Sequence, residues 1–132
     1  MCRLFLIALF IAAAFGAGAA QESIVSLTPE QDLARLAVAP KEMNGIGRLV
    51  VNIVDGDGQP IKGAFAKLDS HRTDGFLCES WASTNSFGLA ALPPIHMGKL
   101  KLKVKAKGYH DQVVELPLDQ LSEAVKVTLK KK

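Results

Sequence analysis

The sequence predicts an all-β fold, a roughly seven-stranded antiparallel Greek-key sandwich with one short N-terminal helix. The first observation is the segment 99–107, where lysine alternates strictly with Leu100, Leu102, Val104 and Ala106. Successive side chains of a strand point to opposite faces, so this segment has one apolar and one charged face. A helix would spread the lysines around its whole circumference. The second observation is that turn residues recur about every ten residues, which is typical of a sandwich.

The N-terminus predicts a secretory signal over residues 1–20. Arg3 is followed by the apolar run Leu4–Phe15 and by small residues at 17–20, in the order of a signal peptide. A membrane anchor is the alternative, but the run is shorter than the roughly 20 residues of a spanning helix. We expect a periplasmic or secreted chain with no membrane span, a lead over 21–44 and one sandwich domain over 45–132.

The lead contains a helix start at Thr28. Thr28 can cap the helix, Pro29 suits its first position, and Gln31 completes a capping box. Pro40 bars continuation of the helix. The short apolar stripe of this helix predicts either that it covers an edge strand of the sandwich or that it binds a partner, and the sequence does not separate the two.

The domain begins with two predicted strands around a turn. Residues 48–54 are apolar on both faces, which predicts a central strand, and 61–69 predict the returning strand with Ala64, Ala66 and Leu68 on one side. Between them, 55–60 is rich in Asp and Gly and predicts a turn. The two aspartates resemble the start of a calcium loop, but no closing glutamate or flanking helices follow, so we expect no metal here.

The stretch Ser70–Ala82 has no clear periodicity and is interpreted as a long loop, a type of segment that often carries function. A turn is predicted at 85–88 and a strand at 89–92, before the lysine strand. After Gly108, a strand over 111–116 is expected to pair with the lysine strand through a three-residue loop. Val114 would then lie opposite Val104, Lys107 opposite Asp111 and Lys103 opposite Glu115. One helical turn over 119–124 and a last strand over 125–129 complete the chain.

Three motifs in order resemble the carboxypeptidase regulatory-like domain. They are Val-Asp-Gly-Asp-Gly-Gln-Pro-Ile-Lys-Gly-Ala at 54–64, Ser-Thr-Asn-Ser-Phe-Gly-Leu at 83–89 and Leu-Lys-Val-Lys-Ala-Lys-Gly-Tyr at 102–109. The resemblance covers about residues 47–129. It implies a transthyretin-like (prealbumin-like) β-sandwich and a non-catalytic role, as in accessory domains of secreted peptidases and in carbohydrate-binding or surface proteins.

Chemistry-bearing residues are few. With Cys2 in the signal, Cys78 is the one cysteine left, so no internal disulfide can form. Cys78 can be buried, reactive or paired between chains, and burial is expected. His71, His96 and His110 are the available bases or ligands, but their spacing matches no catalytic or metal motif. We therefore expect no enzyme, no catalytic or metal residues and no cofactor.

The predicted function is an exported, non-enzymatic binding or accessory module of the cell envelope that recognises a protein or glycan partner. A first alternative is a polyanion binder, for lipopolysaccharide or an acidic glycan, that uses the lysine face. A second is a small hydrolase or metal-binding protein that uses the Ser70–Ala82 loop. Nucleic acid is not expected, because no stacking aromatics stand between the lysines. The oligomeric state stays open. The candidate ligand-binding residues are Lys99, Lys101, Lys103, Lys105, Lys107, His71, Arg72 and Trp81.

Overall fold

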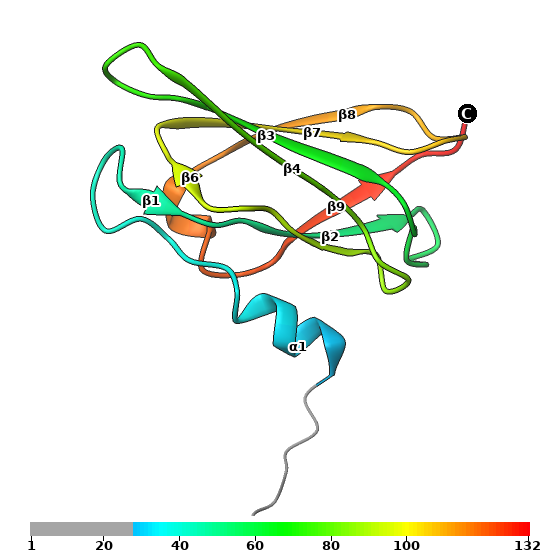
Figure 1. Ribbon diagram of the computed structural model, residues 1–132. Helices are drawn as coiled ribbons and strands as arrows, with labels where there is room; N and C mark the ends of the chain where they lie inside the picture. Colours follow the sequence, from blue (N-terminus) through cyan, green and yellow to red (C-terminus); the bar gives the residue numbers. More distant parts are fainter. Residues whose placement is uncertain (1–27) are drawn as a thin grey trace, which may run out of the picture.

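The structure is a computed structural model that describes residues 28–132, and the predicted signal over 1–20 lies outside these residues (Figure 1). Seven strands form a three-stranded sheet, β5–β2–β9, and a four-stranded sheet, β4–β3–β7–β8. A two-residue pair, β1 with β6, was not predicted. The strands are β1 (Ile46–Gly47), β2 (Val50–Asp55), β3 (Phe65–His71), β4 (Leu77–Ser83), β5 (Leu89–Ala91), β6 (Ile95–His96), β7 (Lys99–Lys105), β8 (Gln112–Leu116) and β9 (Val125–Leu129). The all-β sandwich is confirmed.

The core lies between the two larger sheets. Each contributes the inward residues of its strands, because strand side chains alternate between faces. Leu49, Val51 and Ile53 come from the β2 region, Ala66 and Leu68 from β3, and Leu100, Leu102 and Val104 from β7; all are buried. The predicted apolar face of the lysine strand is therefore core.

The sandwich is not wholly antiparallel. β2 pairs antiparallel with β5 but parallel with β9, from Val51 opposite Val125 to Asp55 opposite Leu129. The segment 61–69 also differs from its prediction. After a short bridge between Val54 and Pro60, the chain crosses to the other sheet, where β3 begins at Phe65. The buried Thr84 hydroxyl fixes this crossing, since it accepts from the Ala64 N–H at 2.9 Å and donates to the Ile61 carbonyl at 2.5 Å.

The prediction of a long loop over Ser70–Ala82 is wrong. Most of this stretch is strand, and β3 and β4 form a hairpin closed by Arg72–Phe76. Gly75 adopts a φ of 89° in that turn, a conformation that glycine tolerates best. β4 lies at the edge of its sheet, so its side chains are exposed or half-buried on both faces apart from Ser80, and no apolar alternation marks it.

The predicted register of β8 is also wrong, by two residues. Leu102 lies opposite Val114 and Leu100 opposite Leu116. The connection is longer than three residues because the C-terminal tail pairs with it, through a bridge between Tyr109 and Lys131. Val114 and Leu116 still face inward, because a shift of two residues keeps the faces of a strand.

The helix α1 (Pro29–Ala34) begins with the predicted capping box between Thr28 and Gln31. It ends earlier than Pro40 and contacts β5, the edge strand of the three-stranded sheet, outside the sandwich (Figure 1). This position fits the prediction that the helix covers an edge. Near the C-terminus, the predicted helical turn is a short 3-10 helix, η1 (Leu118–Gln120). Among residues 28–132, no helix has the length and apolar character needed to cross a membrane.

Candidate functional site

The solvent-facing side of the four-stranded sheet, here called the outer face, collects most of the predicted site residues. On β7, Lys99, Lys101, Lys103 and Lys105 point outward, as the alternation requires. His71 of β3 lies directly opposite Lys99. Trp81 of β4 lies opposite Lys67, which in turn lies opposite Lys103. Six of the eight predicted residues therefore share one face: Lys99, Lys101, Lys103, Lys105, His71 and Trp81.

The centre of the outer face is an ion-pair network that the sequence analysis missed. Lys67 Nζ lies 2.5 Å from Glu79 Oε1 and 3.2 Å from Asp69 Oδ1, and Lys103 Nζ lies 2.7 Å from Asp69 Oδ2. Hydrogen bonds to Glu79 and then to Asp69 raise the pKa of Lys67. Burial by itself raises the pKa of Asp69, but the hydrogen bonds and the charge attraction of Lys103 and Lys67 together outweigh it and leave that pKa lowered. The network therefore holds ammonium and carboxylate groups in fixed positions at the centre of the outer face.

Two lysines of β7, Lys103 and Lys105, are thus paired with carboxylates. Lys105 Nζ lies 3.3 Å from Asp111 Oδ2, and both groups are exposed. Glu115 lies opposite Lys101 rather than Lys103. The predicted partners Asp111 and Glu115 are therefore at the lysine face, but beside different lysines. A uniformly cationic stripe, which a polyanion would prefer, is not what the sheet presents.

Aromatic and aliphatic groups lie among these charges. Trp81 is 57% exposed, Val113 55% and Phe65 39%, and all three point to the outer face. Phe65 lies one outward position along β3 from Lys67, so it is a diagonal neighbour of Trp81 on the adjacent strand. Large aromatic surface exposed on a rigid sheet is free to contact a ligand.

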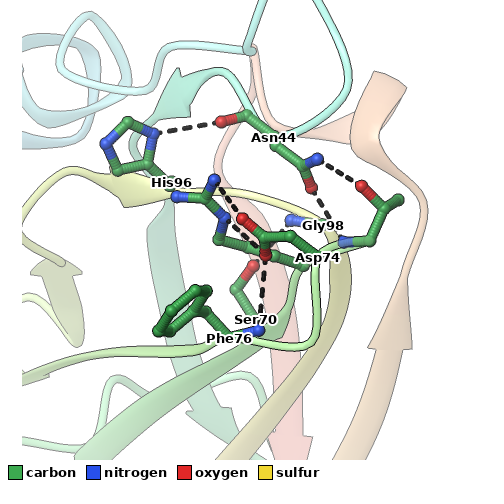
Figure 2. Close-up of polar contacts among 8 residues, drawn as sticks. Asn44, Ser70, Asp74, Phe76, His96 and Gly98 are labelled. Atoms are coloured by element: carbon green, nitrogen blue, oxygen red, sulfur yellow. Dashed lines mark hydrogen bonds and ion pairs between the residues drawn. The ribbon is translucent and has the colours of Figure 1, made fainter.

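Arg72 and Lys107 do not belong to the outer face. Lys107 lies beyond the end of β7. Arg72 is in the β3–β4 turn, where its Nη2 lies 2.6 Å from Asp74 Oδ2. Figure 2 shows this turn tied to the segment before β1: Asn44 Nδ2 donates to Thr73 Oγ1 at 2.5 Å, and Thr73 N–H donates to Asn44 Oδ1 at 3.1 Å. The cluster orders the turn, and Arg72 has a structural role.

The histidines and Cys78 do not form one site. His71 is at the Lys99 end of β7, whereas His110 follows the other end, about 20 Å away along the strand. His96 Nδ1 lies 3.0 Å from the Asn44 carbonyl oxygen (Figure 2). Cys78 is free and half-buried, so the prediction that it is fully buried is wrong. Within the described part of the chain, no three His, Cys, Asp or Glu side chains are grouped to hold a metal ion.

The Asp-rich turn at 55–60 also has a structural explanation. Asp55 Oδ1 accepts hydrogen bonds from the backbone N–H groups of Asp57 and Gln59, at 2.9 and 3.0 Å. This is the turn chemistry of aspartate, in which the carboxylate satisfies its own backbone. The Asp55 carboxylate is therefore already hydrogen-bonded to the backbone of its own turn.

Comparison with known proteins supports the fold. The chain matches no known protein family and no curated protein. A similar solved structure is 3-chlorocatechol 1,2-dioxygenase from Rhodococcus opacus 1CP, with a TM-score of 0.54 and 11% sequence identity. The similarity covers 74% of this chain and 64% of that enzyme, so the chain spans less than two thirds of its length. At this identity the likeness shows a shared fold alone.

Proposed function

We propose that this protein is an exported, non-enzymatic binding module of the cell envelope that recognises a glycan through the outer face. The observation that carries the proposal is the exposed pair Trp81 and Phe65 beside the fixed charges of Lys67, Asp69 and Glu79. A sugar ring presents an apolar C–H face, which stacks on an aromatic ring, and hydroxyls, which hydrogen-bond to ammonium and carboxylate groups.

The size of the outer face favours a glycan over a protein partner. The longest strands have seven residues, so the face is about 20 Å long, and four strands make it about 19 Å wide. The resulting area of roughly 400 Å² is about half of what each partner contributes to a standard protein interface. It is sufficient for an oligosaccharide of a few rings.

Binding is favoured over catalysis by the positions of the titratable groups. A nucleophile needs a base within hydrogen-bond reach, and His71 and His110 are separated by the length of β7. The loop in which a hydrolase or metal site was considered, Ser70–Ala82, is a hairpin. Membership of the carboxypeptidase regulatory-like family is also part of this proposal. The three motifs of that resemblance fall on the end of β2 and the following turn, on the turn before β5, and on β7.

A glycan microarray tests the proposal, with neutral and acidic oligosaccharides as probes. Three proteins are compared: the wild type, Trp81→Ala, and Phe87→Ala as a matched control. Phe87 is 54% exposed but lies in the turn before β5, off the outer face. We expect binding by the wild type and Phe87→Ala and at least a tenfold loss in Trp81→Ala. Binding that survives Trp81→Ala, or a wild type that binds no glycan, would contradict the proposal.

A polyanion remains the second candidate, because one hollow on the outer face is cationic. It has a volume of about 220 Å³ and is lined by His71, Lys99, Lys101 and Glu115. Within the described residues, no carboxylate forms an ion pair with Lys99 or Lys101. Retention on heparin tests this candidate: a polyanion binder elutes at high salt and shifts to low salt in Lys101→Glu/Lys105→Glu. If the double variant elutes at the same salt concentration as the wild type, the polyanion candidate is contradicted.

Export is proposed from the N-terminal sequence. Arg3, the apolar run Leu4–Phe15 and the small residues at 17–20 support it. Expression of the chain in a Gram-negative host, followed by fractionation and N-terminal sequencing, tests it. We expect a mature periplasmic product that begins near Gln21, and an uncleaved cytosolic product would contradict export.

A further inference from the structure

The edge strand β4 presents a free row of backbone hydrogen-bonding groups. In the β3–β4 ladder, Arg72 N–H donates to Phe76 O and Thr84 N–H donates to Ala64 O. Residue pairs in an antiparallel ladder alternate between hydrogen-bonded and non-hydrogen-bonded. The even residues of β4 therefore bond to β3, and the odd residues, from Leu77 to Ser83, point their N–H and C=O groups away from the sheet. Within residues 28–132, no backbone group bonds to them.

β4 also lacks the features that normally protect an edge. Natural edge strands are short, or carry lysine, proline or a bulge. β4 has seven residues, no lysine or proline, and a single charge, at Glu79. The opposite edge, β8, has five residues and is followed by Pro117. Of the two edges of this sheet, β4 is the longer and the less protected.

We propose that β4 pairs antiparallel with β4 of a second copy of this chain, so that two four-stranded sheets join into one. A two-fold axis at Ser80 places Glu79 opposite Trp81 of the partner and Leu77 opposite Ser83 of the partner. All four are the residues whose backbone groups are free, so four residue pairs would form about eight hydrogen bonds. β8, paired in the same way, would form about half as many.

The side chains favour this register over its neighbours. An axis at Glu79 would place two glutamates directly opposite each other, which is destabilising, and would lose one of the four pairs. An axis at Trp81 also loses a pair. At Ser80, the charged side chain faces an indole, and no like charges meet. The self-complementary contact is what a two-fold dimer requires.

A groove along the β4 edge leaves room for the incoming strand. It is shallow, has a volume of about 330 Å³, and is lined by Glu79–Trp81 and by Pro93–Ile95; Ser80 Oγ donates to the Pro93 carbonyl at 2.6 Å. The β4 side chains that point inward are Cys78, Ser80 and Ala82, all small. A second strand that carries the same small residues can approach closely here.

The dimer does not depend on the proposed glycan function. It would place two outer faces side by side in one continuous sheet, with roughly twice the area of one copy. A protein that dimerises through β4 but binds no glycan refutes the proposed function alone. A monomer that binds glycan through Trp81 refutes the dimer alone.

Cysteine crosslinking tests the register. In the proposed dimer, Cys78 lies opposite Ala82 of the partner, in a non-hydrogen-bonded pair whose Cα atoms are about 4.5 Å apart, within disulfide reach. Ala82→Cys in a Cys2→Ser background should crosslink into a covalent dimer on mild oxidation. Cys78 alone, and Ala82→Cys combined with Cys78→Ser, should not, because equivalent residues are about 13 Å apart along the strands. No crosslinking, or equal crosslinking in all three, would overturn the proposal.

Sedimentation velocity provides the second test, with a matched pair of proline variants. Glu79→Pro removes an outward N–H from β4 without breaking the β3 ladder, since proline is tolerated at an edge. The same alternation makes Glu115→Pro the equivalent change on β8. We expect twice the monomer mass for the wild type and Glu115→Pro, and the monomer mass for Glu79→Pro with an unchanged circular dichroism spectrum. A monomeric wild type, or a dimer insensitive to Glu79→Pro, would overturn the proposal.

Discussion

Asp69 is the residue on which the charge network of the outer face depends, and Asp69→Asn tests that dependence. Its side chain is 7% exposed, and its two oxygens lie 3.2 Å from Lys67 Nζ and 2.7 Å from Lys103 Nζ. Asparagine keeps the shape but removes the charge that both ammonium groups face. Hydrogen bonds to charged groups contribute about 1.5–3 kcal/mol each, and solvent at the lysine ends reduces this. We expect the free energy of unfolding to fall by about 2 kcal/mol at pH 7.

The pH dependence separates this electrostatic effect from a packing effect. Because the folded-state pKa of Asp69 is lowered, its contribution is fully present above the ordinary value of 3.8 and is lost as the pH falls through the folded pKa. Urea unfolding, followed by circular dichroism, should show a difference between wild type and Asp69→Asn that is constant from pH 7 to 5 and shrinks toward pH 2. Glu115→Gln is the control, and its free energy of unfolding should differ little from that of the wild type. A difference that does not vary with pH would refute the reasoning.

Three further predictions concern the packing that supports the outer face. Thr84→Val should cost about 2–4 kcal/mol in urea unfolding, because it leaves the Ala64 N–H and the Ile61 carbonyl without their partner; equal stability of Thr84→Val and the control Thr84→Ser would contradict this. Leu102→Ala, at a fully buried position, should lower the free energy of unfolding by about 3 kcal/mol, and a loss below about 1 kcal/mol would place Leu102 outside the core. Gly88→Ala should destabilise more than Gly58→Ala in thermal unfolding, although both glycines have positive φ, because only at Gly88 does an added Cβ meet a backbone oxygen. Equal melting temperatures for those two variants would count against the close approach.

The strands that bury one full face were predictable from the sequence. β7 alternates lysine with apolar residues, and β9 alternates from Val125 to Leu129, so period-two patterning identified both. The Thr28 capping box was also predictable, because a cap is a local arrangement of a few side chains.

The parts that could not be predicted depend on contacts between distant segments. β4 is exposed or half-buried on both faces apart from Ser80, so it has no apolar period, although Asp74-Gly75 is a hairpin turn signal that would have indicated it. The connection before β8 pairs with the C-terminal tail through a bridge between Tyr109 and Lys131, a contact between distant segments that no local rule contains. The charge network was missed for the same reason, since Lys67 and Glu79 become neighbours only when β3 and β4 pair.

Tryptophan fluorescence tests the central claim most directly, because Trp81 is the one tryptophan in the sequence and lies on the outer face. Oligosaccharides that bind on the microarray are titrated into the wild type and Phe87→Ala while the emission is recorded. We expect a saturable change in emission with the same affinity in both proteins, because the indole loses water as the sugar stacks on it. An oligosaccharide that binds while the emission of Trp81 stays unchanged would contradict the account.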